Sequence, residues 1–355
     1  MIITSVRLLN FRNYVDEEGQ FVKGLNVIEG PNGAGKTNIV EALHLASLGK
    51  SFRVTESKNL IKNGEEKARV ILSLVKPTKT EIDITLKGNQ KYILVNGKTL
   101  PKVSMLNEYL HTLVFSPSDI TIFEASPLTR RDFLDEQISY FDKTYLEVRK
   151  DYEKILKARN EHLKSEEFDE KLHEVYTQKF VALGLEITRK REAYIKKLDN
   201  ALSNSINEMT KRRIPLRLEY QNSLKSRSSE EENVKVLLAL KEREKVLGVS
   251  LKGPHRDDLV AFIGQNKVAT HASQGQKRLL SIALKVAPYE LIENYHEKPV
   301  VILDDVLSEL DATHQELLLE YIKKFKQVFI TTTKYALNAH AIYEVKANHI
   351  SRRIE

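Results

Sequence analysis

The sequence predicts an α/β fold whose two halves are separated along the chain by an inserted α-helical lobe. Apolar strands followed by helices occur near both ends of the chain, and residues 98–183 between them contain no glycine. Apolar residues also fall three or four positions apart through much of that middle region. We therefore expect residues 1–127 and 248–355 to form one lobe, and residues 128–247 the insertion. The 355-residue chain is long enough for two lobes.

The first segment of the predicted α/β lobe begins with two short strands, at 6–11 and 25–28, on either side of a polar turn at 16–19. Apolar residues at helical spacing predict a helix over residues 38–48. A β meander follows, because apolar runs alternate with Gly-Asn and Asn-Gly turn signals. Its strands are expected at 69–75, 80–86 and 92–95.

The inserted lobe is expected to contain a pair of long amphipathic helices with a turn near 164–169. We interpret the pair as an ordinary helical subdomain, and a true coiled coil is the alternative. A polar loop at 223–232 and a helix at 234–247 complete the insertion. The α/β pattern then resumes, with the strand at 299–303 buried on both faces because its apolar run is unbroken. The other expected elements are a strand at 259–263, helices at 276–287 and 313–325, and a strand at 327–331.

Composition excludes several classes of protein. Hydrophobic residues make up 41% of the chain, which is enough for a core and excludes wholesale disorder. The chain has no cysteine, which excludes disulfides, a cysteine nucleophile and cysteine-ligated metal sites. The formal net charge of +7 permits a polyanionic partner without requiring one. No apolar stretch is long enough to cross a membrane and no signal peptide is apparent, so we expect a soluble, cytoplasmic protein.

A glycine-rich segment follows the second expected strand and leads into a helix, which is the context of a phosphate-binding loop. It fits the pattern G-x-x-x-x-G-K-[ST] and consists of Gly30, Pro31, Asn32, Gly33, Ala34, Gly35, Lys36 and Thr37. Glycines allow backbone N–H groups to turn inward around a phosphate, and the helix N-terminus adds partial positive charge. Lys36 would reach the β- and γ-phosphates and Thr37 would bind Mg²⁺. The expected cofactors are therefore ATP and Mg²⁺, and a chance glycine-rich turn is the alternative.

Two carboxylates, Asp304 and Asp305, come directly after the buried strand at 299–303. A parallel strand of a doubly wound sheet delivers its last residues to the ligand crevice. We expect Asp304 to hold Mg²⁺, directly or through water. Asp305 is expected to be catalytic, together with Lys36, by orienting or deprotonating the attacking water.

Further motifs point to one family. Residues 273–276, Ser-Gln-Gly-Gln, resemble the signature motif of ABC-type ATPases, and residues 308–311, Ser-Glu-Leu-Asp, resemble their D-loop. Residues 10–14, Asn-Phe-Arg-Asn-Tyr, resemble the segment by which chromosome-maintenance and Rad50-like heads approach the nucleotide. Together with the phosphate loop through Asn38, with Gly-Pro-His-Arg-Asp-Asp at 253–258, and with residues 303–311, they resemble the bacterial RecF family of DNA replication and repair proteins. Size and motif order agree over essentially the whole chain.

The resemblance implies an ABC-type P-loop ATPase head, a split mixed sheet with flanking helices, carrying an inserted α-helical lobe. It also implies an ATP-dependent, head-to-tail homodimer in which the signature segment of one chain completes the nucleotide site of the other. Residues implied to bind nucleotide in addition to the phosphate loop are Arg12, Asn38, Ser273, Gly275, Gln276 and Asp311. For Arg12, a surface ion pair with Asp16 or Glu17 is the alternative.

The chain departs from the common ABC-type pattern in three places. Asp305 stands where most such ATPases have Glu, which implies slow turnover. Residues 331–334, Thr-Thr-Thr-Lys, replace the switch histidine, so a hydroxyl there could contact the γ-phosphate but could not act as a base. No Q-loop glutamine can be assigned, although residues 116–119 occupy about the right region.

By resemblance, the protein is expected to bind duplex DNA and single-strand/duplex junctions in an ATP-dependent way. Slow, DNA-stimulated ATP hydrolysis would accompany recombinational repair and replication restart at gapped DNA, with the RecO and RecR mediator proteins as partners. Basic clusters at 50–53, 130–131, 189–191 and 211–213 are candidate DNA contacts, and solvated helix faces are the alternative. A non-hydrolysing ATP-binding scaffold and another ABC-type ATPase subunit, such as that of a transporter, are the competing functions.

Overall fold

The computed structural model describes residues 1–76, 78–117, 121–142, 144–292, 298–334 and 339–353. The chain forms two compact units. The first comprises Met1–Ile120, Ser205–Arg212 and Gln274–Glu355, and the second Thr121–Asn204 and Arg213–Ser273. The expected boundaries at 127/128 and 247/248 both fall within the second unit, because the helix that begins at Pro127 and the strand that begins at Asp258 are grouped with it.

The first unit contains a mostly parallel six-stranded sheet in the order β15-β14-β3-β13-β12-β8. All neighbouring strands in it are parallel except the terminal β14–β15 hairpin. The carboxyl ends of β3, β13 and β12 therefore meet at one edge, where such sheets bind ligands. The strands are β3 (Gly24–Glu29), β8 (Thr112–Phe115), β12 (Val300–Asp304), β13 (Gln327–Thr332), β14 (Ala341–Lys346) and β15 (His349–Arg353).

A second, antiparallel sheet in the same unit has the order β2-β1-β4-β5-β6-β7. Its strands are β1 (Ile2–Leu9), β2 (Asp16–Gln20), β4 (Lys67–Lys76), β5 (Thr78–Lys87), β6 (Gln90–Val95) and β7 (Lys98–Thr99). The predicted β meander is confirmed as β4–β6. The polar turn expected at 16–19 is wrong, because this segment is edge strand β2, whose Asp16 pairs with Arg7 of β1 at 2.7 Å.

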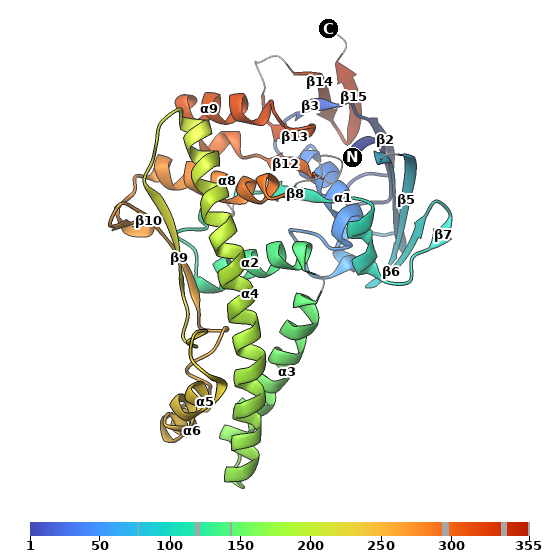
Figure 1. Cartoon of the computed structure of the whole chain (residues 1–355). Coiled ribbons are helices and arrows are strands. Elements are labelled where there is room, and N and C mark those ends of the chain that lie inside the picture. The colour runs from blue at the N-terminus through green and yellow to red at the C-terminus, as the bar shows by residue number, and fades with distance from the viewer. Residues whose placement is uncertain (77, 118–120, 143, 293–297, 335–338, 354–355) are drawn as a thin grey trace. The chain divides into compact units, whose positions relative to one another are not determined.

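Helix α1 lies between the two sheets (Figure 1) and is buried on almost every side. One apolar cluster joins its residues to strands of both sheets, which fixes the helix that follows the phosphate loop. The other helices of this unit are α8 (Gln274–Glu290) and α9 (Ala312–Ile322), and α1 itself is Lys36–Leu48. The 3₁₀ turns that lie within the described residues of this unit are η1 (Ser57–Leu60), η2 (Val103–Glu108) and η5 (Leu307–Glu309).

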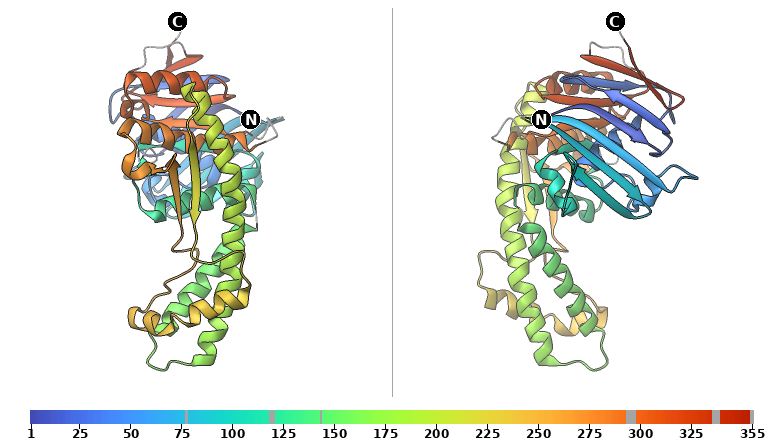
Figure 2. Two further views of the ribbon diagram at one scale, coloured as in Figure 1. Left: turned by 60° about the vertical axis from the view of Figure 1, so that its left-hand side comes forward. Right: turned by 90° about the vertical axis from the view of Figure 1, so that its right-hand side faces the viewer.

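The second unit is built on the predicted pair of long helices, α3 and α4, which run side by side and are joined by residues 164–169 (Figure 2). Gly184 of α4 packs closely against Leu224 and Pro254, which lie outside both helices. This is the packing of a helical subdomain, as expected, and not of a two-stranded coiled coil. Its helices are α2 (Pro127–Phe141), α3 (Tyr145–Leu163), α4 (Glu170–Thr210), α5 (Glu230–Leu238), α6 (Lys241–Leu247) and α7 (Val268–His271), and α4 from Ser205 onward is grouped with the first unit.

A small three-stranded sheet, β11-β10-β9, completes the second unit. Its strands are β9 (Leu216–Gln221), β10 (Asp258–Ile263) and β11 (Asn266–Lys267). The single helix expected at 234–247 is wrong, since α5 ends at Leu238 and α6 begins at Lys241. Within the part of the chain that the structure describes, no helix is both long and apolar enough to span a bilayer.

Candidate nucleotide-binding site

The phosphate loop connects the carboxyl end of β3 to the first turn of α1, and its glycines are sterically required. Gly33 and Gly35 have φ angles of 81° and 107°, in the left-handed region that favours glycine. A Cβ on Gly30 would lie 2.4 Å from the carbonyl oxygen of Val345, and one on Gly35 would lie 2.7 Å from the hydroxyl of Tyr14. Gly30 and Gly35 are therefore required by close neighbours, and Gly33 and Gly35 by their left-handed backbone.

Lys36 places its ammonium group inside the loop. The residue is 6% exposed, and its Nζ donates to the carbonyl oxygens of Gly30 at 2.8 Å and Pro31 at 3.0 Å. Burial lowers the pKa of Lys36, and the charges of Asp305 and Asp304 oppose that shift. A desolvated cation at a helix N-terminus is suited to a phosphate group.

Asp304 and Thr37, which are 267 residues apart, meet at the edge of the parallel sheet. Thr37 donates to Oδ1 of Asp304 at 2.9 Å, and Thr331 donates to the same oxygen at 2.6 Å. Burial raises the pKa of Asp304, and the hydrogen bonds from Thr331 and Thr37 oppose it. Thr331 also accepts from the backbone N–H of Asp305 at 2.9 Å. Its strand, β13, lies between β3 and β12, and this one hydroxyl bonds both residues of the acid pair.

The hydroxyl of Thr37 and the carboxylate of Asp304 are oxygen ligands of the kind that Mg²⁺ prefers. Among the described residues, no group of three or more His, Cys, Asp or Glu side chains could hold a metal ion on its own. Mg²⁺ commonly takes one or two protein ligands and completes its shell with phosphate oxygens and water.

Asp305 lies just beyond the end of β12, with a left-handed backbone at φ 53°. Aspartate tolerates this conformation better than most residues, and backbone strain of this kind concentrates at functional sites. The carbonyl oxygen of Asp305 accepts a hydrogen bond from the hydroxyl of Ser308 at 2.7 Å. Ser308, the first residue of the expected D-loop, therefore holds the backbone of Asp305 in place.

Gly275 of the signature segment lies close to the D-loop and α9 in the first unit, whereas Ser273 is grouped with the second unit. A Cβ on Gly275, in the first turn of α8, would lie 3.0 Å from the ring of His314 and 3.6 Å from Oδ2 of Asp311. Asp311 caps α9 by accepting from the backbone N–H of His314 at 3.0 Å, so its side chain already has an intramolecular role. Ser273 and Gln276 are exposed.

Arg12 does not form either of the expected surface pairs. Its Nε and Nη2 donate to the two carboxylate oxygens of Glu41, each at 2.8 Å. Asp16 pairs with Arg7 instead, and Glu17 accepts from His349 at 3.0 Å. The alternative interpretation of Arg12 is therefore wrong, because a buried carboxylate on α1 is available to the guanidinium.

Several neighbours of the loop were missed by sequence reasoning. Asn38 donates to Oδ1 of Asn13 at 2.6 Å and accepts from Nη1 of Arg53 at 3.0 Å. The charge of Arg53 also lowers the pKa of Asp304. Arg53 and Glu41 are the residues that were not assigned to this site from the sequence. Arg53 was assigned above to a candidate DNA-binding cluster, and Glu41 could have been noticed as an acid among the apolar residues of a predicted helix.

Two of the other basic clusters are largely used inside the second unit. Arg130 donates from Nε and Nη2 to the two carboxylate oxygens of Asp258 at 2.7 and 2.8 Å, and Arg191 pairs with Asp135 at 2.8 Å. Both arginines are buried, so neither a DNA contact nor a solvated helix face describes them. Arg189 is exposed.

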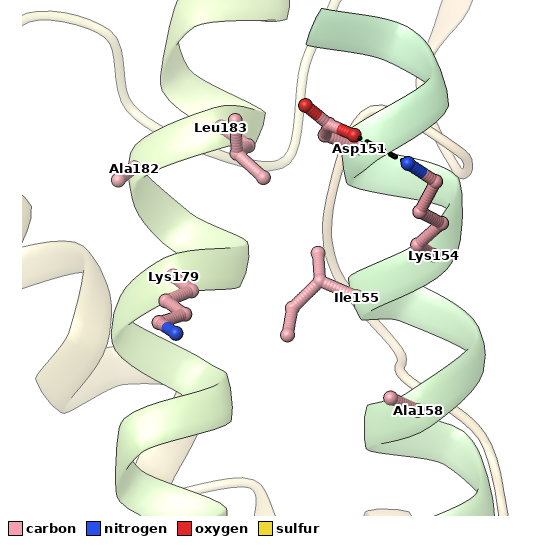
Figure 3. Close-up of a pocket in the computed structure, with 7 residues that line it drawn as sticks. All are labelled: Asp151, Lys154, Ile155, Ala158, Lys179, Ala182 and Leu183. Carbon is pink, nitrogen blue, oxygen red and sulfur yellow. Dashed lines mark hydrogen bonds and ion pairs between the residues drawn. The ribbon is translucent and has the colours of Figure 1, made fainter.

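An apolar groove lies between α3 and α4 (Figure 3). The side chains of Ile155, Ala158 and Leu183 line it, and the Asp151–Lys154 ion pair, at 2.8 Å, stands at its edge. None of the residues that line this groove was expected to bind nucleotide.

Residues 116–119 occupy about the region where a Q-loop glutamine would be expected. Of these, Ser118 and Asp119 lie outside the described residues.

Comparison with known proteins covers almost the whole chain. A family described as the RecF/RecN/SMC N-terminal domain matches residues 2–352. The DNA replication and repair protein RecF of Geobacillus thermodenitrificans is 32% identical over 369 residues, covering 99% of each chain. RecF of Listeria welshimeri is 35% identical over 346 residues, covering 94% of this chain and 93% of its own.

Solved structures agree on the fold. A structure described as the recombination mediator protein RecF–ATP in the RecFOR pathway matches with a TM-score of 0.87 and 31% identity, covering 99% of this chain and 98% of its own. An Smc head bound to the C-terminal winged-helix domain of ScpA matches with a TM-score of 0.61 and 16% identity, covering 99% of this chain and 97% of its own. The expected ABC-type head with an inserted helical lobe is thus confirmed.

Proposed function

Because this chain belongs to the RecF family of DNA replication and repair proteins, we propose that it is an ATP-dependent DNA-binding protein with slow, DNA-stimulated ATPase activity. The observation that carries the nucleotide part is the contact between Thr37, which follows the loop lysine, and Asp304, at 2.9 Å. It unites a complete phosphate loop with a buried acid at one sheet edge. The relative solved with ATP adopts the same fold.

In the proposed mechanism, Lys36 and the loop N–H groups bind the β- and γ-phosphates, while Thr37 and Asp304 would hold Mg²⁺. When bound, Mg²⁺ would offset the negative charge of the phosphates. Asp305 orients the attacking water and accepts its proton. With one methylene fewer than Glu, Asp305 has a shorter reach toward that water, which would slow turnover. The hydroxyl of Thr331 holds Asp304 and the backbone of Asp305 in place, and the expected γ-phosphate contact at 331–334 is left to exposed Thr333.

ATP is proposed to bring two chains together head to tail. Ser273, Gly275 and Gln276 of one chain would cap the γ-phosphate bound by the other, and Asp311 would lie beside them. Contacts to the γ-phosphate exist only with ATP, so ATP favours the dimer and hydrolysis releases it. The exposure of Ser273 and Gln276 is compatible with a contact to another chain.

The DNA role is proposed from the family and from charge. The protein would act in the cytoplasm on duplex DNA and single-strand/duplex junctions, assisting recombinase loading at gaps together with RecO and RecR. A relative described as a recombination mediator in the RecFOR pathway supports this. Lys50 of the 50–53 cluster and the cluster at 211–213 remain candidate DNA contacts, whereas Arg53 lies at the nucleotide site; binding through these cations would weaken with salt.

The test of nucleotide binding is calorimetric titration of ATP and Mg²⁺ into the wild-type chain and into Lys36→Met. We expect the variant to fold normally and to bind ATP at least a hundredfold more weakly, because about 3 kcal/mol of charge-assisted hydrogen bonding is lost. Equal affinities would refute the loop assignment. Phosphate release measured with and without duplex DNA then separates a DNA-stimulated ATPase from a non-hydrolysing scaffold, which would release none.

A further inference from the structure

Glu41 is a wholly buried carboxylate one helical turn after Thr37 on α1, and it gathers donors from two separate segments. Arg12, from the segment before the phosphate loop, binds both of its oxygens at 2.8 Å. Arg53, from the segment after α1, places Nη1 3.6 Å from Oε2, and the hydroxyl of Ser51 donates to Oε1.

Both segments lead directly to the nucleotide site. Tyr14, two residues after Arg12, donates to the carbonyl oxygen of Gly35 in the phosphate loop at 3.1 Å. Arg53 donates to Asn38, the residue after Thr37, at 3.0 Å. The Arg53 guanidinium therefore contacts the residue after Thr37, and the segment that carries Arg12 contacts the residue before Lys36 through Tyr14.

Two guanidinium groups share the single carboxylate of Glu41, and the charge of Arg53 also acts on Asp304 at the nucleotide site. One buried carboxylate cannot neutralise two guanidinium groups, and a buried carboxylate without a partner would itself be strongly unfavourable. The side chain of Arg12 is 19% exposed and that of Arg53 is 44% exposed, so neither is sealed in the core. Both guanidinium groups are therefore accessible to an anion bound at the loop.

We propose that Glu41 is a positioning residue, which holds the guanidinium groups of Arg12 and Arg53 beside the phosphate loop so that they meet the γ-phosphate of ATP. The inference rests on the proposed ATP-binding function and deepens it. Glu41 does not contact the nucleotide. Its negative charge holds together two guanidinium groups that would otherwise repel each other. Because ADP lacks the γ-phosphate, the contribution of Glu41 is specific to ATP.

The test compares ATP and ADP affinities and turnover for Glu41→Gln, which keeps the shape of the side chain but removes its charge. We expect ATP affinity to fall about tenfold, which corresponds to about 1.4 kcal/mol, while ADP affinity changes less than twofold. The turnover number should also fall about tenfold. In a background carrying Arg12→Gln and Arg53→Gln, the same substitution should have no further effect on the ATP/ADP ratio, since its partners are gone.

Asp83→Asn is the matched control, because Asp83 accepts a comparable bidentate pair of hydrogen bonds from Arg69, at 2.8 and 2.6 Å. This pair lies in the antiparallel sheet of the same unit. A merely structural role for Glu41 would lower the melting temperature, as the control does, and weaken ATP and ADP equally; that result would overturn the inference. An unchanged ATP/ADP ratio in a folded Glu41→Gln would overturn it as well.

Glu41→Asp guards against a variant that fails to fold, since it keeps the buried charge and shortens its reach. We expect it to retain the wild-type melting temperature and to lose ATP/ADP discrimination in part; full discrimination would count against the inference. If wild-type and Lys36→Met chains bind ATP equally, the proposed function fails first. If only Lys36→Met loses ATP binding and Glu41→Gln behaves as wild type, the inference about Glu41 fails alone.

Discussion

Replacing Arg191 should destabilise the second unit and leave DNA contacts intact, whereas replacing its exposed neighbour Arg189 should not affect stability. Arg191 is 4% exposed, and its Nη2 and Nε donate to Asp135 at 2.8 and 3.0 Å. It also donates to the hydroxyl of Tyr220 at 3.2 Å and to the carbonyl oxygen of Pro254 at 2.8 Å. The guanidinium therefore links α2, α4, β9 and the 253–258 segment.

The magnitude follows from what Arg191→Ala leaves behind. Asp135 is 3% exposed. It would keep its hydrogen bond from the hydroxyl of Tyr145 and its ion pair with Nη1 of Arg149 at 3.4 Å, but it would lose its closest counter-charge. Breaking a buried pair in this way costs about 3–5 kcal/mol, which is a fall on the order of 10 °C in the melting temperature of a unit this size. Arg189→Ala should change stability by no more than about 0.5 kcal/mol.

Urea unfolding and differential scanning calorimetry measure the stability of both variants, and DNA binding is followed from low to moderate salt. An Arg191→Ala chain with wild-type stability, but with a salt dependence of DNA binding reduced by about one phosphate contact, would refute the assignment of Arg191 to the interior. We predict that Arg191→Ala lowers stability and leaves the salt dependence of DNA binding unchanged. Arg189→Ala serves as the matched surface control.

Three further predictions concern the site and DNA. Asp305→Asn should retain ATP and Mg²⁺ affinity while phosphate release nearly stops; an unaltered rate would place the catalytic carboxylate elsewhere. Asp304→Asn should be at least as stable as the wild type at pH 7, because burial raises the pKa of Asp304 above its ordinary value of 3.8. The carboxyl of Asp304 binds its proton more tightly in the folded wild type than in the unfolded chain. The difference in stability between Asp304→Asn and the wild type should therefore shrink as the pH falls through the raised pKa. Melting curves in which this difference widens on acidification would contradict the prediction. DNA affinity of the wild type should require ATP and fall steeply between low and moderate salt, as counterion release demands, and filter binding that finds no salt dependence would exclude the electrostatic interface.

The core of the site was predictable because its signals are local. The spacing from Gly30 to Thr37, an apolar strand before it and a helix after it determine the loop without tertiary information. The acid pair was predictable because four buried aliphatics place Asp304 at the end of a parallel strand. The residue-level roles assigned to these positions remain predictions, as do the boundaries at 127/128 and 247/248.

What the sequence could not reveal depends on long-range partners. A polar segment such as 16–19 is predicted as a turn, yet it becomes an edge strand because β1 offers it a ladder and Arg7 a counter-charge. A basic run such as 189–191 does not reveal which arginine faces inward until the position of Asp135 is known. The pairing of Arg12 with Glu41, 29 residues away, is of the same kind.

The most direct measurement of the central claim, that ATP drives two chains together across their signature segments, is sedimentation velocity with ATP and Mg²⁺, with ADP and without nucleotide. The wild type should dimerise only with ATP, and Asp305→Asn should accumulate as the dimer. Ser273→Arg should bind ATP as a monomer, because a long guanidinium does not fit a contact shaped for serine and glycine. A stable, ATP-dependent dimer of Ser273→Arg would contradict the account.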